Sequence, residues 1–212
     1  QMERYDDALT DLTRAIELDP NLYWAIAGRG ETYRQMGRYD DALTDLTRAI
    51  ELEPTHASTI LSRGQIYRQM GRYDDALTDL FRTLVIDSTL SWCHYEIAIV
   101  MHVLGRPGEQ ERWQIAAEAF EADIASGAYP IADAQGNLLV MRCAVSDWAR
   151  ATEELEKFLA CSPTAARIRE ALDDLQDVEV NLAKDPNDLR PLRRELEAAV
   201  EAAAGLPRPS DV

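Results

Sequence analysis

The chain has 212 residues, of which 46% are hydrophobic and 28% are charged, a composition typical of a globular or helical-repeat protein. Its 38 acidic residues outnumber its 22 basic residues, so the formal net charge is −16. That sign argues against general binding to nucleic acids or acidic membranes, since both are polyanions. The apolar runs are also too short to cross a bilayer, so we expect neither nucleic acid nor membrane among the partners.

The first segment, residues 1–20, begins a repeated pattern. Its sequence MERYDDALTDLTRAIELDP recurs from Met36 to Pro54 with only two changes, and the first eleven residues of that second copy recur from Met70. Each copy places its apolar residues at the spacing of one helix face, as in Ala42, Leu43, Leu46, Ala49 and Ile50. The predicted helix ends just before the proline, whose ring disfavours helical geometry in the residue before it.

A second predicted helix, Tyr23 to Met36, precedes this copy and has the same period. Gly37 follows it and suits the left-handed position that ends many helices. Each 34-residue unit is therefore predicted to be an antiparallel helical hairpin, with complete units at 21–54 and 55–88. Residues 1–20 supply only the second helix of a truncated first unit.

These units resemble the tetratricopeptide repeat, a 34-residue helical hairpin with a characteristic residue pattern. The positions that match the pattern are Ile26, Arg29, Gly30, Tyr33, Ala42, Leu46 and Pro54, then Ile60, Arg63, Gly64, Tyr67, Ala76, Leu80 and Ser88. The resemblance implies an all-α fold, a right-handed superhelical α-solenoid of antiparallel hairpins. Near-identical repeats of this kind resemble bacterial arrays, in which the array often senses a partner for an attached effector domain.

Two features of the repeat have direct physical interpretations. Gly30 against Ala42, and Gly64 against Ala76, allow the two helices of a hairpin to approach closely. Arg29 and Arg63 stand where the family usually has leucine. We expect their aliphatic stems to lie on the packing surface and their guanidinium groups to reach neighbouring acids.

Beyond residue 88 the pattern decays. Residues 89–127 are predicted as a divergent unit with a longer second helix, and residues 128–163 as a degenerate unit. Residues 164–205 are helical but carry acids or large residues where the glycine should be, so we expect C-terminal capping helices with a polar outer face. The last segment, 206–212, is predicted to be disordered.

The sequence contains none of the common catalytic or nucleotide-binding motifs that we considered, so we expect no enzyme activity and no cofactor. His94 and His102 are eight residues apart, about 12 Å along a helix, which is too far for one metal ion. The three cysteines are widely separated and form no C-x-x-C pair. A reducing cytoplasmic location is therefore expected.

In the resembled family the first helices line a concave groove that binds partners, and the register identifies the residues expected there. They are Trp24, Ala27, Glu31, Arg34, Ser58, Leu61, Gln65, Arg68, Trp92, Tyr95, Ile99 and His102. This surface changes from charged to apolar along the chain, which suits a protein or peptide partner with an apolar anchor and an acidic neighbour. Arg34 could instead pair with Glu31 on its own helix. For Trp24, packing between adjacent units is favoured over a role as anchor.

The leading hypothesis is a non-enzymatic protein-interaction scaffold, the C-terminal repeat region of a larger bacterial signalling or regulatory protein. The alternative is a self-association module that forms a homodimer. In that reading the helix of residues 1–20 lacks its first-helix neighbour and exposes an apolar face formed by Ala8, Leu9, Leu12 and Ile16.

Overall fold

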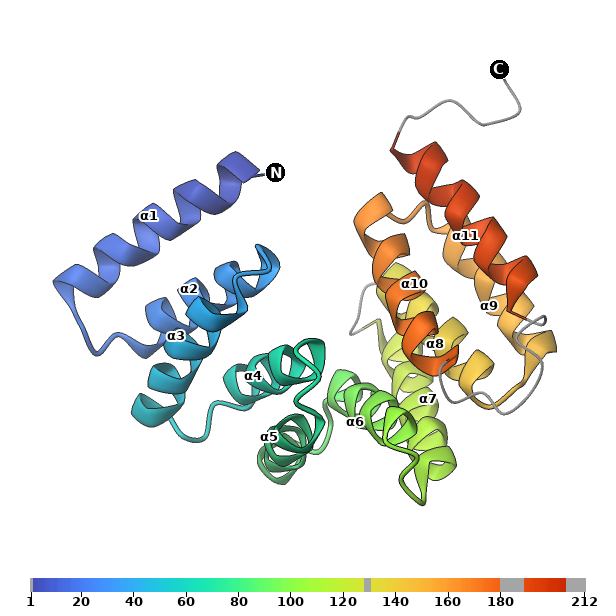
Figure 1. The fold of residues 1–212 in the computed structure, drawn as a ribbon, viewed down its shortest axis with the longest axis horizontal. Coiled ribbons are helices and arrows are strands. Elements are labelled where there is room, and N and C mark those ends of the chain that lie inside the picture. Colours follow the sequence, from blue (N-terminus) through green and yellow to red (C-terminus); the bar gives the residue numbers. More distant parts are fainter. Residues whose placement is uncertain (1, 128–130, 180–188, 205–212) are drawn as a thin grey trace. The chain divides into compact units, whose positions relative to one another are not determined.

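The computed structural model describes residues 2–127, 131–179 and 189–204, and within those ranges every regular element is a helix (Figure 1). The helices are α1 (Met2–Leu18), α2 (Tyr23–Gln35), α3 (Tyr39–Leu52), α4 (Ala57–Gln69), α5 (Tyr73–Ile86), α6 (Ser91–Val103), α7 (Glu109–Ser126), α8 (Ile131–Ala144), α9 (Trp148–Ala160), α10 (Ala165–Glu179) and α11 (Arg190–Ala203). The predicted all-α fold is confirmed. The predicted tail 206–212 lies outside the described residues.

The chain divides into two compact units, unit 1 from Gln1 to Cys93 and unit 2 from His94 to Val212, so the division falls inside α6. Unit 1 contains α1 and the hairpins α2/α3 and α4/α5. Unit 2 contains most of α6 together with α7 to α11. Within the described residues no helix is long and apolar enough to cross a membrane.

The hairpins of unit 1 are built as the repeats predict. Gly37 and Gly71 end the first helices with φ angles of +71° and +72°, a conformation that glycine adopts without steric cost. A Cβ atom added to Gly30 would lie 2.9 Å from Leu46 Cγ and 3.3 Å from the Ala42 carbonyl oxygen. The glycine therefore sets the close approach of α2 to α3.

A repeated arginine contact joins each hairpin of unit 1 to the helix before it. The Arg29 guanidinium donates two hydrogen bonds to Asp45, at 2.6 and 2.8 Å, and a third of 3.4 Å to Thr13 of α1. Arg63 repeats this contact with Asp79, at 2.6 and 2.8 Å, and with Thr47 of α3 at 3.3 Å. The expected contact of these two arginines with acids is confirmed, but the charges are not in solvent as expected, because the Arg29 and Arg63 side chains are only 19% and 15% exposed. We call each set an arginine clamp.

The arginine clamps are shielded from solvent. Asp45 and Asp79 are 5% and 3% exposed. The hydrogen bonds that Arg29 donates to the Asp45 carboxylate raise the pKa of Arg29 above its ordinary value, although burial alone would lower it. Charged, paired hydrogen bonds of this geometry are among the stronger polar contacts in proteins, so the clamps hold the hairpins in register.

Unit 2 has a core rich in aromatic side chains. Tyr95, Trp113 and Phe120 are fully buried, with Tyr95 in edge-on contact with the other two at ring-centre distances of 6.0 and 6.1 Å. α7 has 18 residues, against 14 in each of α3 and α5. Ser146, with a φ angle of +60°, takes the place after α8 that Gly37 takes after α2.

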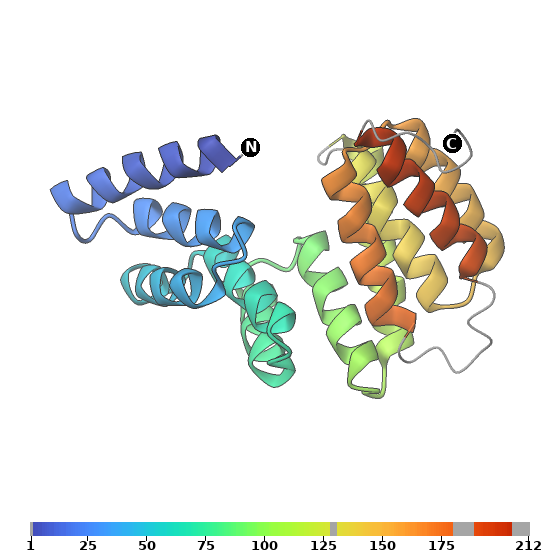
Figure 2. The same ribbon diagram turned by 45° about the horizontal axis from the view of Figure 1, so that its top comes forward.

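The last two helices do not continue the stacking of unit 1. There, the first helix α4 packs against α3 of the preceding hairpin, with Ile66 against Ala42 and Leu46. In unit 2, α10 packs against α8, and α11 contacts α9 and α10; both views show α10 beside α8 (Figures 1 and 2). α10 therefore covers the first helix of the preceding hairpin.

Candidate functional site

The surface formed by the first helices of unit 1 is partly open to solvent. We call it the unit 1 face; its residues are Trp24, Ala27, Glu31 and Arg34 of α2 and Ser58, Leu61, Gln65 and Arg68 of α4. Trp24 is 55% exposed and Ser58 is exposed, while Ala27, Glu31, Arg34 and Arg68 are partly buried. The preference for Trp24 as a packing residue is wrong, because more than half of this side chain lies in solvent.

Two residues of the unit 1 face are less accessible than expected. α4 contacts α2, α3 and α5, and its middle positions Leu61 and Gln65 are only 9% and 8% exposed. They can contribute shape to the face but little contact area. The accessible part of the face therefore lies around Trp24, Arg34 and Ser58.

Arg34 forms the pair with Glu31 that was the alternative to a role in partner binding. Its Nε and Nη2 atoms donate to the two Glu31 carboxylate oxygens at 2.9 and 2.7 Å, and Gln35 donates to the same carboxylate at 3.1 Å. Burial alone would raise the pKa of Glu31, but the hydrogen bonds from Arg34, Gln35 and Ser62 of α4 hold it below its ordinary value. Glu31 therefore carries a negative charge that links α2 to α4.

The corresponding residues of α6 lie differently. Trp92 is partly buried, whereas Tyr95 and Ile99 are 0% exposed and His102 is 3% exposed. The Tyr95 hydroxyl donates to the Asp174 carboxylate of α10 at 2.7 Å, and His102 Nε2 donates to the Val178 carbonyl oxygen at 2.9 Å. Tyr95, Ile99 and His102 are therefore not exposed groove residues in this structure, because the chain's own α10 covers this part of α6.

Sequence reasoning missed the role of α10. Its apolar residues Ile168, Ala171, Leu175 and Val178 follow the spacing of one helix face, and all four are buried. That spacing is visible in the sequence and predicts an amphipathic helix. It does not show which surface the helix covers, because the contacting residues of α6 lie more than seventy positions earlier.

The apolar face expected on α1 is smaller than predicted. Ile16 is 8% exposed and packs with Ala25, Ile26 and Ala49, and Leu12 packs against the same cluster. Ile16 is therefore wrong as a member of an open face, because α2 covers it. Ala8 and Leu9 stay partly exposed, and Leu9 lines a shallow hollow with Thr13 and Glu17.

The described residues contain no group of three or more His, Cys, Asp or Glu side chains placed to hold a metal ion. The three cysteines are free thiols, and Cys93 and Cys143 are buried. Burial raises the pKa of Cys143 to about 12, so this thiol is not a thiolate nucleophile near neutral pH.

Comparisons with known proteins agree with this architecture. Residues 27–89 match a family model of the tetratricopeptide repeat, and residues 1–44 match a second model with the same description. Comparison with curated protein sequences found no match.

Several solved structures resemble the chain. One is PilW, a widely conserved type IV pilus biogenesis factor, with 16% identity over 97% of this chain and 89% of that chain at a TM-score of 0.61. A tetratricopeptide repeat protein from Parabacteroides merdae has 18% identity over 92% of this chain and 79% of that chain at 0.57. YrrB, a repeat protein with an unusual peptide-binding site, has 16% identity over 92% of each chain at 0.52. At these identities the likeness shows the fold.

Proposed function

Because this chain is a tetratricopeptide repeat protein, we propose that it is a non-catalytic interaction module whose unit 1 face binds a peptide or helix of a protein partner. Trp24 is the observation that carries the proposal. An aromatic side chain that is 55% exposed beside the Arg34–Glu31 pair offers an apolar anchor next to charged groups. Peptide binding by YrrB supports the same kind of ligand. The three free thiols suit a cytoplasmic setting.

The partner expected on this face has an apolar anchor for Trp24 and an acidic residue near Arg34. Arginine can present two donors to a carboxylate, so an acid on the partner can compete with Glu31 for Arg34. By analogy with bacterial arrays of similar repeats, binding here would report the presence of the partner to an attached effector domain.

The proposal can be tested without knowing the partner. The immobilised full chain is used to select binders from a displayed library of random peptides, and the enriched peptides are synthesised. Trp24→Ala is expected to weaken their binding at least about tenfold, which corresponds to about 1.4 kcal/mol for a central anchor. Arg34→Glu combined with Arg68→Glu should weaken those peptides that carry acids.

The matched control is Val85→Ala, which truncates an apolar side chain that is 87% exposed on the second helix α5. Equal affinity of the selected peptides for wild-type chain, Trp24→Ala and Val85→Ala would place their site elsewhere and refute the proposal.

A second candidate function is self-association through α1. The observation that favours it is the partly exposed pair Ala8 and Leu9 beside the hollow that Leu9 lines with Thr13 and Glu17. Leu9→Glu should then convert a dimer to a monomer in light scattering. A monomeric wild-type chain at high concentration would refute this candidate.

A further inference from the structure

In unit 2, α10 lies against the first-helix positions whose equivalents in unit 1 form the proposed partner surface. Counting back ten residues from each left-handed residue that follows a first helix gives equivalent positions, namely Ala27, Leu61, Tyr95 and Gly136. In unit 2 both residues at this position meet α10. Tyr95 donates to Asp174, and a Cβ atom on Gly136 would lie 3.3 Å from Arg167 Nη2. α10 therefore lies on the first-helix surface of α6 and α8, which we call the unit 2 face.

Polar contacts fix α10 on the unit 2 face at both ends. Near its beginning, Arg167 Nη2 donates to Asn137 Oδ1 at 2.7 Å, and near its end the Val178 carbonyl accepts from His102. The exposed side of α10 carries Arg169, Glu170, Asp173 and Gln176. The helix thus has one side that packs against the unit 2 face and another that is exposed to solvent, as a bound amphipathic helix has.

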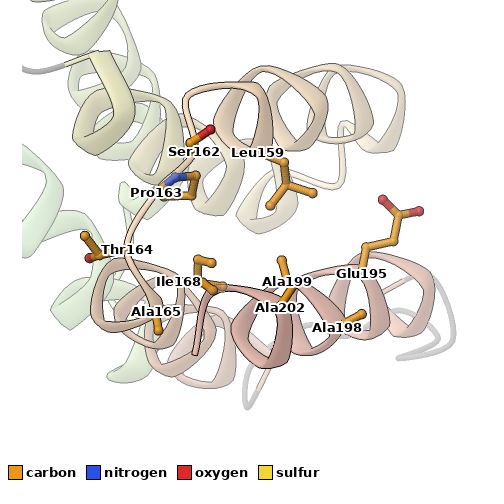
Figure 3. Close-up of a pocket in the computed structure, with 11 residues that line it drawn as sticks. Leu159, Ser162, Pro163, Thr164, Ala165, Ile168, Glu195, Ala198, Ala199 and Ala202 are labelled. Atoms are coloured by element: carbon orange, nitrogen blue, oxygen red, sulfur yellow. The ribbon is translucent and has the colours of Figure 1, made fainter. Parts of the chain in front are cut away.

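The fit of α10 is incomplete in two respects. Asn137 is 1% exposed, and its Nδ2 atom has no hydrogen-bond partner among the residues that the structure describes. A buried donor without an acceptor lowers the stability of the contact that buries it. Beside the N-terminal half of α10 lies a hollow of about 800 Å³ that is largely open to solvent, lined by Leu159, Pro163, Ile168 and, on α11, Ala199 and Ala202 (Figure 3). Along this hollow α10 is not closely packed against α9 and α11, although Ile168 and Ala171 themselves are buried.

We propose that α10 is a displaceable occupant of the unit 2 face, and that this face binds an acidic amphipathic helix of a partner protein in its place. The partner helix would carry the pattern of α10, with apolar residues at the places of Ile168, Ala171, Leu175 and Val178 and an acid at the place of Asp174. This inference rests on the proposed function, since it extends binding on first helices to unit 2, and it names the class of partner. An acceptor for Asn137 Nδ2 would allow the partner to bind better than α10 does.

The test uses the full chain and one synthetic probe. The probe is a labelled peptide of residues 164–179, TAARIREALDDLQDVE, and binding is measured by fluorescence polarisation. In the weakened chain, Arg167→Ala and Asp174→Ala remove two polar contacts of α10. The peptide can bind only those chains whose unit 2 face is not covered by α10, so its apparent affinity is the intrinsic affinity multiplied by the fraction of such chains. The weakened chain has a larger uncovered fraction, so the peptide should bind it at least about tenfold more tightly than the wild-type chain.

Matched variants separate a specific site from general loosening of the helix. Arg169→Ala with Asp173→Ala changes one cation and one acid on the exposed side of α10, and this control chain should bind the peptide as weakly as wild type. Adding Tyr95→Phe and Asn137→Ala to the weakened chain should reduce peptide binding at least about tenfold, because the peptide then loses the same two contacts. Equal binding to the weakened chain and to the control chain would overturn the proposal.

Two further measurements test the proposal. The first needs no destabilising variant, and the second addresses the alternative occupant. In hydrogen exchange of the wild-type chain, amides of α10 should exchange at least about tenfold faster than those of α8, and equal rates would overturn the proposal. A dimer of the weakened chain in light scattering would assign the unit 2 face to α10 of a second copy and would also overturn it. Trp24→Ala should leave peptide binding unchanged, so this inference and the proposed function fail by different results.

Discussion

Unit 1 and unit 2 hold their helices together in different ways. In unit 1 the same arginine clamp occurs twice, and each Arg–Asp pair is separated by 16 positions in the sequence. Among the described residues of unit 2, the polar contacts that hold α10 differ from one another, and the Tyr95–Asp174 contact spans 79 positions. The repeated contacts tie neighbouring helices in an array, whereas the single contacts of unit 2 close a long loop of chain. Unit 1 is therefore held together by contacts that recur from one repeat to the next, and unit 2 by contacts between residues far apart in the sequence.

The largest expected effect comes from Gly30→Leu in unit 1. The new side chain would begin 2.9 Å from Leu46 Cγ and 3.3 Å from a backbone oxygen, so α2 and α3 must separate. We expect unit 1 to lose about 3 kcal/mol of stability or more, measured by urea denaturation with far-ultraviolet circular dichroism. Gly28→Ala is the control, because its Cβ atom meets only the end of the flexible Leu12 side chain. Equal midpoints for both variants would show that Gly30 does not set the hairpin spacing.

Asp45→Ala tests the arginine clamp. It leaves the Arg29 guanidinium, whose side chain is 19% exposed, without its buried carboxylate. Loss of one partner of such a pair should reduce stability by about 2 to 3 kcal/mol in the same denaturation experiment. Asp41→Ala breaks the exposed pair with Arg38 and should cost under about 1 kcal/mol. If the two variants were equally stable, the clamp would not hold unit 1 together.

Tyr95→Phe makes the corresponding change in unit 2. It removes the hydroxyl that donates to Asp174 and keeps the ring contacts with Trp113 and Phe120. We expect a loss of about 1 kcal/mol in unit 2 and none in unit 1, resolved by hydrogen exchange of α10 and α3 amides. Faster exchange in α3 would contradict the separation into two units.

The smallest expected effect is that of Glu31→Gln, which gives α2 the residue that α4 has at the equivalent position, Gln65. Because the pKa of Glu31 is lowered in the folded chain, its contribution to stability is present above the ordinary value of 4.5 and is lost as pH falls through the lowered folded value. The variant should be less stable than wild type by under about 1 kcal/mol at pH 7, and the difference should vanish in acid.

The control for this pH dependence is the exposed Glu51→Gln in α3, which should not change thermal stability at either pH. A stability difference between wild type and Glu31→Gln that persisted at low pH would mean that the charge of Glu31 is not its cause.

The comparison of units also explains how much could be predicted from sequence. The helix bounds of unit 1, the left-handed Gly37 and the clamp of Arg29 depend on residues less than one repeat apart, so the repeated pattern contained them. The position of α10 depends on Tyr95 and His102, which no local pattern connects to Asp174 and Val178. The exposure of Trp24 was mispredicted because residue type indicates average burial, while the actual burial depends on which helices lie beside α2.

One consequence of the arginine clamp concerns the length of the array. Thr13 and Thr47 stand 34 positions apart and play the same part for Arg29 and Arg63. A chain from which residues 21–54 were deleted would join Pro20 to Thr55 and would present Thr13 to Arg63, while Asp79 would keep its arginine. Unequal recombination between the near-identical copies could therefore change the number of hairpins in one step, with every new junction already supplied with its partners.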